Sequence, residues 1–325
     1  MCILKMKINK ALFIVDSPFQ VICALEAISY YRIDEPHFLL QDDIVACEKT
    51  LPLVKQYKNV FIIERGDYST RALFNNVRKK LKKKYETIFI GDYYAYWEYV
   101  VATILSKPLS RFIYLDDGNS TLAIVPPLSR RRGIGRGRIW YNILILYNRF
   151  RLVKDSLFTI YDLGNQCSLP YEKNLFSSLK GNNVNKKNGV YVIGTNSDAL
   201  HLRDKSYKQY LESLNDYIKK VYPTEVVYYC PHRMDSTDYT EFVRNFQWLM
   251  FKTEYSVEID FVRTGITPLF VVGFGSTALL TLKFIYPYSD ICTIFVNLQK
   301  EEDNIENRLI EEYLYKNGVR IVKLF

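Results

Sequence analysis

The sequence has little cysteine, little histidine and no long apolar run. Its six cysteines form no C-x-x-C pair and follow no zinc-like spacing, which argues against a zinc site. A reducing cytoplasm is therefore the expected compartment. No apolar run approaches about 18 residues, so no segment is predicted to span a bilayer. The first residues lack the apolar core of a signal peptide, and none is predicted.

Familiar nucleotide signatures are also missing. The chain has neither a Walker loop nor a G-x-G-x-x-G fingerprint, so neither ATP nor NAD is assigned. It has no recognisable nucleic-acid module and no internal repeat. Of its three histidines, His37 is expected beside a strand and His201 at a helix start, which leaves His232 as the candidate for chemistry.

The composition is that of a globular chain with about two domains. Its 325 residues are 48% hydrophobic and 24% charged, which is enough to bury a core. Tyrosine is abundant, at 27 residues. Its ring and hydroxyl suit sugar and nucleotide pockets, and they also suit ordinary half-buried strands.

The formal charge of +9 is concentrated in two basic clusters, residues 78–84 and 130–138. Such clusters suit a nucleic acid, an anionic membrane surface or an acidic sugar, and they equally suit a solvated helix face or a flexible loop. The apolar stretch 139–147 is flanked by arginines. It is typical either of a helix that rests on a membrane surface or of a buried helix or strand.

Short apolar runs alternate with segments of helical period along the first half of the chain, which predicts a parallel, doubly wound sheet. Ser17 and Gln20 have the spacing of a capping box at the first helix. The predicted strands are residues 10–16, 37–40, 60–63, 87–92 and 111–115, and the predicted helices are residues 18–28, 70–84 and 96–105. The pattern loosens from about 120 to 185.

A Gly- and Asn-rich segment, residues 181–189, is the predicted linker between an N-terminal domain (1–180) and a C-terminal domain (190–325). A second alternation follows it. Its predicted strands are residues 190–193, 225–229, 269–273, 292–296 and 320–324, and its predicted helices are residues 207–221, 239–249, 276–282 and 305–315. The predicted fold class is α/β, with two Rossmann-like domains facing a cleft where a ligand can bind.

Asp116, Asp117, Gly118 and Asn119 follow a predicted strand of the first half. A carboxylate at the carboxyl edge of a parallel sheet projects towards the ligand crevice and can act as a general base. Adjacent residues of an extended chain point opposite ways, so one of the two acids is expected to face the crevice. The pair lacks the D-x-D spacing of a shared metal site, and it is also typical of a turn before glycine.

Two further candidates belong to the second half. Gly275, Ser276 and Thr277 lie between a predicted strand and a helix, where free N–H groups and hydroxyls can bind phosphate or carboxylate, although such residues commonly serve only as a helix cap. His232 and Arg233 follow a strand that Pro231 interrupts. They can offer positive donors to a phosphate leaving group, or they can form a polar turn.

These motifs, in this order, resemble those of bacterial sialyltransferases of the lipooligosaccharide group (glycosyltransferase family 52) and the related capsular polysialyltransferases. The family has an acidic-acidic-glycine triplet, a His-Pro pair and a Ser-Ser or Ser-Thr pair that opens a helix. Asp116 to Gly118, His232 and Ser276 to Thr277 occupy those places. Residues 16–20 (DSPFQ) are similar to the first strand-turn-helix of the family. The resemblance spans most of the chain, with motifs of two to five residues.

The resemblance implies a GT-B fold, CMP-sialic acid as donor, inversion at the anomeric carbon and no metal cofactor. It implies that Asp117 deprotonates the acceptor hydroxyl and that His232 stabilises or protonates the departing phosphate. The implied donor-binding residues are Gly194, Thr195, Asn196, Arg233, Glu258, Gly275, Ser276 and Thr277, and the acceptor-side candidates are Ser17, Gln20, Asp116 and Asn119. Glu258 resembles a carboxylate that holds the ribose hydroxyls in related enzymes.

One position departs from the family pattern. Arg233 follows the histidine where the family has proline, and Pro231 precedes it instead. Arg233 can add positive charge towards the phosphate.

The sequence therefore predicts an inverting, metal-independent sialyltransferase that acts on a terminal galactose or sialic acid of a surface glycan. The expected location is the cytoplasm, with peripheral contact at the inner face of the membrane. A homodimer is left open. One alternative is a GT-B transferase with another nucleotide-sugar donor. The other is a basic protein that binds polyanions without catalysis.

Overall fold

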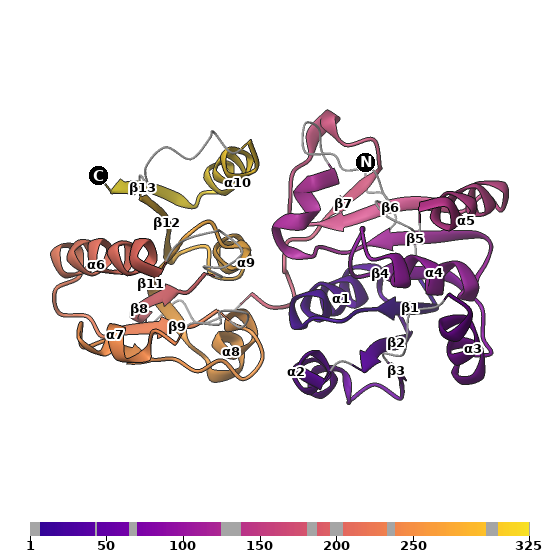
Figure 1. Ribbon diagram of the computed structural model, residues 1–325, viewed down its shortest axis with the longest axis horizontal. Coiled ribbons are helices and arrows are strands. Elements are labelled where there is room, and N and C mark those ends of the chain that lie inside the picture. The colour runs from indigo at the N-terminus through magenta and orange to yellow at the C-terminus, as the bar shows by residue number, and fades with distance from the viewer. Residues whose placement is uncertain are drawn as a thin grey trace. The chain divides into compact units, whose positions relative to one another are not determined.

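The computed structural model describes residues 7–42, 44–64, 70–124, 138–180, 187–195, 204–232, 238–296 and 305–324. The chain divides into two compact units, Met1–Ser178 and Leu179–Phe325 (Figure 1). None of the described helices is long and apolar enough to cross a membrane.

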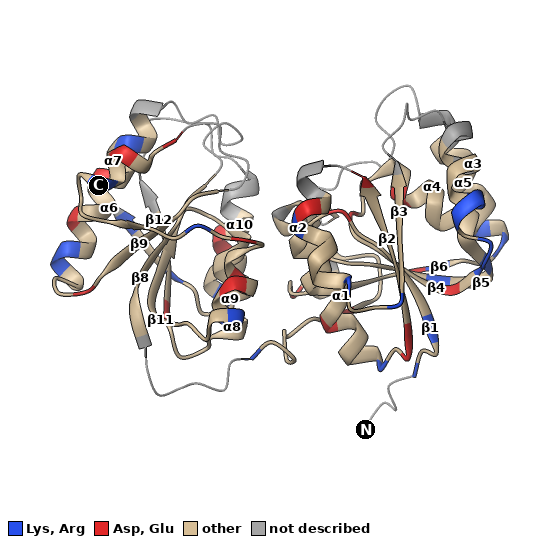
Figure 2. Cartoon of the chain, turned by 90° about the horizontal axis from the view of Figure 1, so that it is seen from below, with Lys and Arg blue, Asp and Glu red and all other residues tan. Residues whose placement is uncertain are grey.

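The first unit is built on a seven-stranded sheet in the order β3-β2-β1-β4-β5-β6-β7, in which every neighbouring pair is parallel. Helices α1 and α2 cover one face, and α3, α4 and α5 cover the other (Figures 1 and 2). The strands are β1 (Lys10–Ile14), β2 (Glu35–Asp42), β3 (Asn59–Glu64), β4 (Tyr85–Ile90), β5 (Ser106–Tyr114), β6 (Lys154–Thr159) and β7 (Tyr171–Lys173). The helices are α1 (Pro18–Tyr31), α2 (Ile44–Val54), α3 (Thr70–Lys80), α4 (Tyr96–Leu105) and α5 (Arg138–Phe150).

Three phenylalanines form the centre of this sheet. Phe13 of β1 lies opposite Phe38 of β2 and Phe89 of β4 in the strand register, and all three are fully buried. The ring centroids are 5.2 Å apart for Phe13 and Phe38 and 4.4 Å apart for Phe13 and Phe89. Each buried ring contributes on the order of 1.5–3 kcal/mol, so this row holds the three central strands in register.

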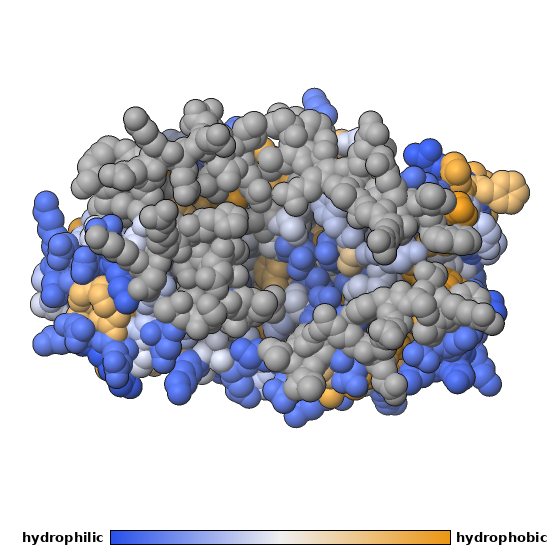
Figure 3. Space-filling view, in the orientation of Figure 1, coloured by the Kyte–Doolittle hydropathy of each residue, from blue (hydrophilic) through white to orange (hydrophobic). Residues whose placement is uncertain are grey.

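Helix α5 carries its hydrophobic side chains on two sides. Tyr141 is buried against the unit, whereas several large apolar side chains of the helix are exposed. They form part of the hydrophobic surface that is seen at the α5 edge of the unit in Figure 3.

The second unit is built on a six-stranded parallel sheet in the order β10-β9-β8-β11-β12-β13. Its strands are β8 (Lys187–Ile193), β9 (Val227–Cys230), β10 (Leu249–Met250), β11 (Thr267–Gly273), β12 (Asp290–Val296) and β13 (Arg320–Leu324). Its helices are α6 (Asp204–Val221), α7 (Thr240–Arg244), α8 (Val257–Thr264), α9 (Thr277–Ile285) and α10 (Ile305–Lys316). Two doubly wound parallel sheets confirm the predicted α/β class.

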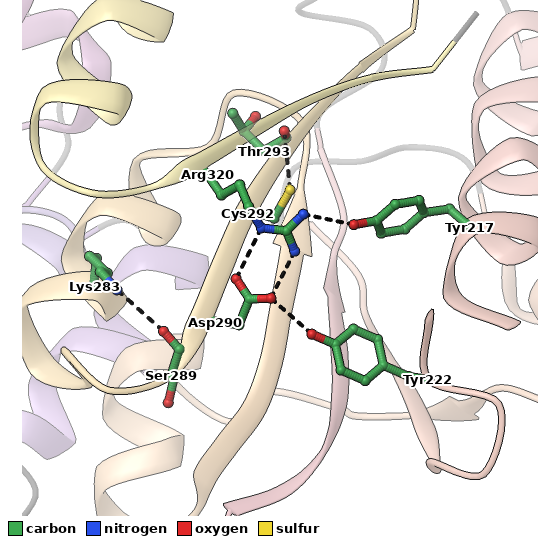
Figure 4. Close-up of polar contacts among 8 residues, drawn as sticks. All are labelled: Tyr217, Tyr222, Lys283, Ser289, Asp290, Cys292, Thr293 and Arg320. Carbon is green, nitrogen blue, oxygen red and sulfur yellow. Dashed lines mark hydrogen bonds and ion pairs between the residues drawn. The ribbon is translucent and has the colours of Figure 1, made fainter. Parts of the chain in front are cut away.

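A polar clamp ties the amino ends of two strands in the second sheet (Figure 4). Asp290, the first residue of β12, accepts from Arg320 Nη2 at 2.7 Å and from Arg320 Nε at 3.3 Å. Tyr222 donates to the same carboxylate at 2.8 Å, and Arg320 Nη1 donates to the hydroxyl of Tyr217 at 2.8 Å. Because parallel sheets place ligands at the carboxyl ends of their strands, the clamp has a structural role at the opposite edge.

The second half differs from the sequence prediction at one predicted helix, and it contains two elements that were not predicted, α8 and β10. The predicted helix 239–249 ends at Arg244, because Gln247 has a φ of 66° and the chain then forms β10 beside β9. The strand β8 begins at Lys187, inside the predicted linker, of which residues 181–186 lie outside the described ranges.

Candidate functional site

The carboxyl edge of the first sheet has its topological switch point between β1 and β4, since the chain moves outward in opposite directions from these two strands. Ligands of open α/β sheets bind at this point. The loops that leave β1 and β4 there contain Asp16–Ser17 and Gly91–Asp92. Asp117 follows β5, the neighbour of β4.

Gln20 connects the first loop to Asp117. Ser17 caps α1, because its side chain accepts from the N–H of Gln20 at 3.2 Å. The amide oxygen of Gln20 accepts from the N–H of Asp16 at 2.8 Å, one residue before the cap. Its amide nitrogen donates to Asp117 Oδ1 at 3.0 Å. The predicted capping residues therefore also orient the carboxylate of Asp117.

Gly91 provides the space that the Gln20 amide occupies. Its N–H donates to the carbonyl of Ile14 at 2.8 Å, which brings the end of β4 against the end of β1. A Cβ added at Gly91 would lie 2.2 Å from Gln20 Oε1 and 3.1 Å from the oxygen of Ile14. Only glycine fits here without moving the amide, and the sequence prediction did not include this residue.

Asp116 and Asp117 point in different directions, as expected for neighbours on an extended chain. Asp116 is fully buried and accepts from Thr159 Oγ1 at 2.6 Å and from the N–H of Ile160 at 2.7 Å, which ties β5 to the end of β6. Burial raises the pKa of Asp116 to about 7, a larger effect than the lowering by its hydrogen bonds. Asp117 is half-buried and accepts weakly from Ser120 Oγ at 3.4 Å through Oδ2.

Glu98 is a buried acid at the same edge that sequence reasoning missed. It is 0% exposed in the first turn of α4, and its Oε2 accepts from the N–H of Asp92 at 2.9 Å. Its Oε1 has no hydrogen-bond partner among the described residues. Burial raises the pKa of Glu98 well above its ordinary value, and the nearby carboxylates of Asp16, Asp92 and Asp117 raise it further. The available signal was a single carboxylate in an otherwise apolar helix.

Glu98→Gln should increase the free energy of unfolding at alkaline pH relative to the wild type. Below the ordinary pKa of 4.5, Glu98 holds its proton in both states. As pH rises above that value the unfolded chain releases the proton while the folded chain keeps it, so the wild type loses stability until the folded pKa is passed. The advantage of the variant should grow by up to about 1.4 kcal/mol per pH unit over this window.

Urea unfolding of both proteins from pH 5 to pH 9 measures this difference. Asp116 contributes equally to the pH dependence of the two proteins. Glu212→Gln, which removes an exposed acid from α6, controls for loss of charge in general. A stability difference between Glu98→Gln and the wild type that does not change with pH would show that Glu98 is ionised in the folded protein.

The carboxyl edge of the second sheet has its switch point between β8 and β11. Three strands end there at the same level, because Ile193 of β8 lies opposite both Cys230 of β9 and Gly273 of β11. The residues that follow these three strands include Gly194, His232 and Gly275. The described candidates for donor binding thus gather at one switch point, with the exception of Glu258.

His232 lies directly against Gly194. The N–H of Gly194 donates to the carbonyl of Cys230 at 2.8 Å, which extends the pairing of β8 and β9 by one residue. A Cβ added at Gly194 would lie 2.9 Å from the backbone nitrogen of His232. The next residue, Thr195, is buried, and its N–H donates to the hydroxyl of Tyr207 at 3.3 Å. Because Gly194 has no side chain, the backbone of His232 can lie directly beside it.

Gly275, Ser276 and Thr277 form the entry to α9. Gly275 has a φ of 55°, and its N–H donates to Thr293 Oγ1 at 3.0 Å. Ser276 is the N-cap, and its side chain accepts from the N–H of Ala278 at 3.3 Å. This hydroxyl thus has a structural role. The amino end of the helix still carries the positive end of its dipole, which favours an anion.

The remaining candidates are placed as follows. Glu258 is buried in the first turn of α8. Asn119 lies in the 3-10 helix Gly118–Ile124 that follows Asp117. Asn196 and Arg233 lie outside the described residues. In the part of the chain that the structure describes, no three His, Cys, Asp or Glu side chains come together in a way that could hold a metal ion.

No family model matches the chain, and no curated protein matches it by sequence. Solved structures do match over nearly its full length. The α/β-galactoside α-2,3-sialyltransferase of Photobacterium phosphoreum is 11% identical, with 97% of this chain and 98% of that chain covered and a TM-score of 0.56. The 2,6-sialyltransferase of Photobacterium sp. JT-ISH-224, solved with CMP and lactose, is 12% identical, with 97% and 78% covered and a TM-score of 0.57.

A putative UDP-N-acetylglucosamine 2-epimerase of Listeria monocytogenes is similar to the same extent. It is 10% identical, with 95% of this chain and 88% of that chain covered and a TM-score of 0.53. At these identities the likeness concerns the fold. Two Rossmann-like parallel units, arranged in sequence as in these structures, confirm the predicted GT-B architecture.

Proposed function

We propose that this protein is an inverting, metal-independent sialyltransferase that moves sialic acid from CMP-sialic acid to a hydroxyl of a terminal galactose or sialic acid. The observation that carries the proposal is the oriented carboxylate of Asp117, held by Gln20 at the switch-point edge of the first sheet. Two structures with the same fold are named as sialyltransferases, and one of them was solved with CMP and lactose. They support the donor class.

In this proposal the first unit activates the acceptor. Asp117 accepts the proton of the acceptor hydroxyl as its oxygen attacks the anomeric carbon, and the configuration at that carbon inverts. The amide of Gln20 fixes one carboxylate oxygen of Asp117. The weakly bonded Oδ2 is the oxygen that can take the proton. A general base of this kind typically contributes on the order of 10²- to 10⁴-fold in rate.

The second unit binds the donor and stabilises the leaving group. As the bond to sialic acid breaks, negative charge grows on the phosphate of CMP. The imidazole of His232, a hydrogen-bond donor, and the amino end of α9, with the positive end of its dipole, lie at one sheet edge, which suits such a phosphate. Glu258, Thr195 and the residues at 196 and 233 are the further donor-binding candidates of this proposal.

The partners in the proposal are a nucleotide-sugar donor, a glycan acceptor and an anionic membrane surface at the inner face of the cell membrane. The second candidate function keeps the fold and changes the donor to a UDP-sugar. The likeness to a protein named as a UDP-N-acetylglucosamine 2-epimerase favours this alternative.

Calorimetric titration with nucleotides separates the two candidates. CMP should bind at least tenfold more tightly than UDP or GDP, and transfer from CMP-sialic acid should persist in the presence of a chelator. Hydrolysis of CMP-sialic acid is a readout that needs no acceptor. Preferential binding of UDP, or complete loss of transfer on chelation, would refute the sialyltransferase proposal.

A further inference from the structure

The outer side of α5 carries an apolar stripe. Ile143, Leu146, Tyr147 and Phe150 follow one another at helical spacing, and all four are exposed, Leu146 by 62% and Phe150 by 87%. Residues spaced by three, four and seven positions lie on one side of a helix. A surface helix normally turns such a stripe towards the core, so α5 has the reverse arrangement for a helix in water.

The stripe extends onto two neighbouring turns. Leu109 and Leu152 are exposed, and both have a positive φ, of 60° and 55°. The N–H of Leu109 donates to the carbonyl of Arg151 at 2.9 Å, which places the start of β5 beside the end of α5. Six of the large exposed hydrophobic side chains in the described residues therefore belong to this surface, which we name the α5 face.

Polar contacts fix α5 in this orientation. Asn148, on the buried side, donates to Tyr99 Oη at 3.0 Å and to Thr103 Oγ1 at 2.8 Å on α4. Arg151 donates to the carbonyl of Thr103 at 3.2 Å and to Ser106 Oγ at 3.0 Å. Rotation of α5 to bury its stripe would break these buried hydrogen bonds. The hydrogen bonds on the packed side of α5 thus keep the apolar stripe exposed.

The surroundings of the α5 face are basic. Residues 138–154 contain four basic side chains and no acidic one. Lys84 donates to the carbonyl of Ile104 at the end of α4, close to Arg151 and to Arg78, whose charges lower its pKa in addition to the larger effect of burial. Figure 2 shows lysines and arginines gathered on this side of the first unit. Asp155, which follows Lys154, accepts from the hydroxyl of Tyr114 at 3.3 Å, and Glu86 forms an ion pair with Lys107.

We propose that the α5 face docks on an anionic phospholipid membrane. An apolar helix stripe with a basic rim inserts its side chains at the headgroup boundary while its cations meet the lipid phosphates. A second copy of the chain suits this surface less well, because a symmetric contact would bring the two basic rims together. The inference rests on the membrane partner of the proposed function and assigns that contact to the first unit, and vesicle binding tests it separately from the transfer reaction.

Vesicle co-sedimentation tests the inference. Wild-type protein should bind vesicles of phosphatidylcholine with 30% phosphatidylglycerol at least tenfold more tightly than vesicles of phosphatidylcholine alone, and 0.5 M NaCl should weaken this binding. The double variant Leu146→Ser/Phe150→Ser should reduce binding to the anionic vesicles at least tenfold. Both side chains are exposed, so the variant should fold normally.

Matched controls lie in the second unit. Tyr288→Ser and Tyr315→Ser remove aromatic side chains that are 70% and 71% exposed, and they should leave vesicle binding unchanged. Arg149→Gln should weaken binding to anionic vesicles, whereas Lys219→Gln, on exposed α6 surface, should not. Equal binding by wild type and the double variant would overturn the proposal. It would also be overturned by a dimer in sedimentation equilibrium that the double variant abolishes, in the absence of vesicle binding.

Discussion

Asp117→Asn should lower glycosyl transfer by roughly 10²- to 10⁴-fold and leave CMP binding unchanged. The substitution keeps the size of the side chain and removes the group that accepts the acceptor proton. Asn can still accept from Gln20 Nε2 through its own amide oxygen, so the local fold is preserved. Transfer rates measured with saturating donor and acceptor report the loss, and calorimetry with CMP reports the integrity of the second unit.

Asp155→Asn is the matched control, since it removes the same charge from β6 of the same unit. Gln20→Leu should reduce transfer less severely, by roughly tenfold, because it frees the carboxylate of Asp117 without removing it. The losses from Gln20→Leu and Asp117→Asn should not add in the double variant, as expected for side chains in contact. If Asp117→Asn keeps full transfer activity, the assignment of the base is wrong. If Gln20→Leu keeps full transfer activity and Asp117→Asn does not, then Gln20 does not position Asp117.

The parallel, doubly wound class of both sheets could be predicted because its signal is local. Apolar runs of strand length alternate with helical periods, and parallel strands joined by helices have few possible arrangements. The switch points follow from the strand order, and Asp117 and His232 each follow the end of a strand beside one of the switch-point strands, β5 and β9. Short elements gave no such signal: β10 has two residues and β7 has three, and no periodicity marks a strand of that length. The longer elements α2, β6 and α8 were also not predicted.

The contacts within the site could not be read from the sequence. Gln20 and Asp117 are 97 residues apart, and they meet only because β4 lies between β1 and β5 in the sheet. Capping-box spacing marks Gln20 as a residue of the first turn, yet its amide also donates to Asp117 in a second loop. Gly91 has no pattern of its own. Its importance comes from the position of another side chain, which only the packed structure defines.

Composition left the character of residues 139–147 open between a buried element and a surface helix. In the structure Tyr141 packs its ring against Tyr99 of α4 and Asn148 donates to Thr103, whereas Leu146 and Phe150 are exposed. Hydrophobic pattern alone cannot predict this result, because it assumes that the apolar side of a helix is the packed side.

His232→Ala should lower transfer and acceptor-free hydrolysis of CMP-sialic acid together, by roughly 10²- to 10³-fold, which corresponds to about 2.7–4 kcal/mol of barrier. The reason is that a donor to the leaving phosphate acts where charge grows, whichever nucleophile attacks. This expectation distinguishes His232 from Asp117, because the loss of Asp117 should reduce transfer to an acceptor rather than acceptor-free hydrolysis. The fall should appear mainly in kcat, because a contact that strengthens in the transition state contributes less to donor binding.

His37→Gln is the matched control. His37 is fully buried between the hydroxyl of Tyr85 and the carboxylate of Glu35, so its substitution should reduce stability and leave the rate per folded molecule unchanged. Gly194→Ala tests the role of His232 in a second way, through its backbone. Its Cβ would press on the backbone nitrogen of His232 at 2.9 Å and on the oxygen of Cys230 at 3.0 Å, and backbone atoms cannot turn aside as a flexible side chain does. Gly194→Ala should therefore reduce hydrolysis of the donor although His232 is still present. If His232→Ala and Gly194→Ala both hydrolyse the donor at the wild-type rate, His232 has no role in the mechanism.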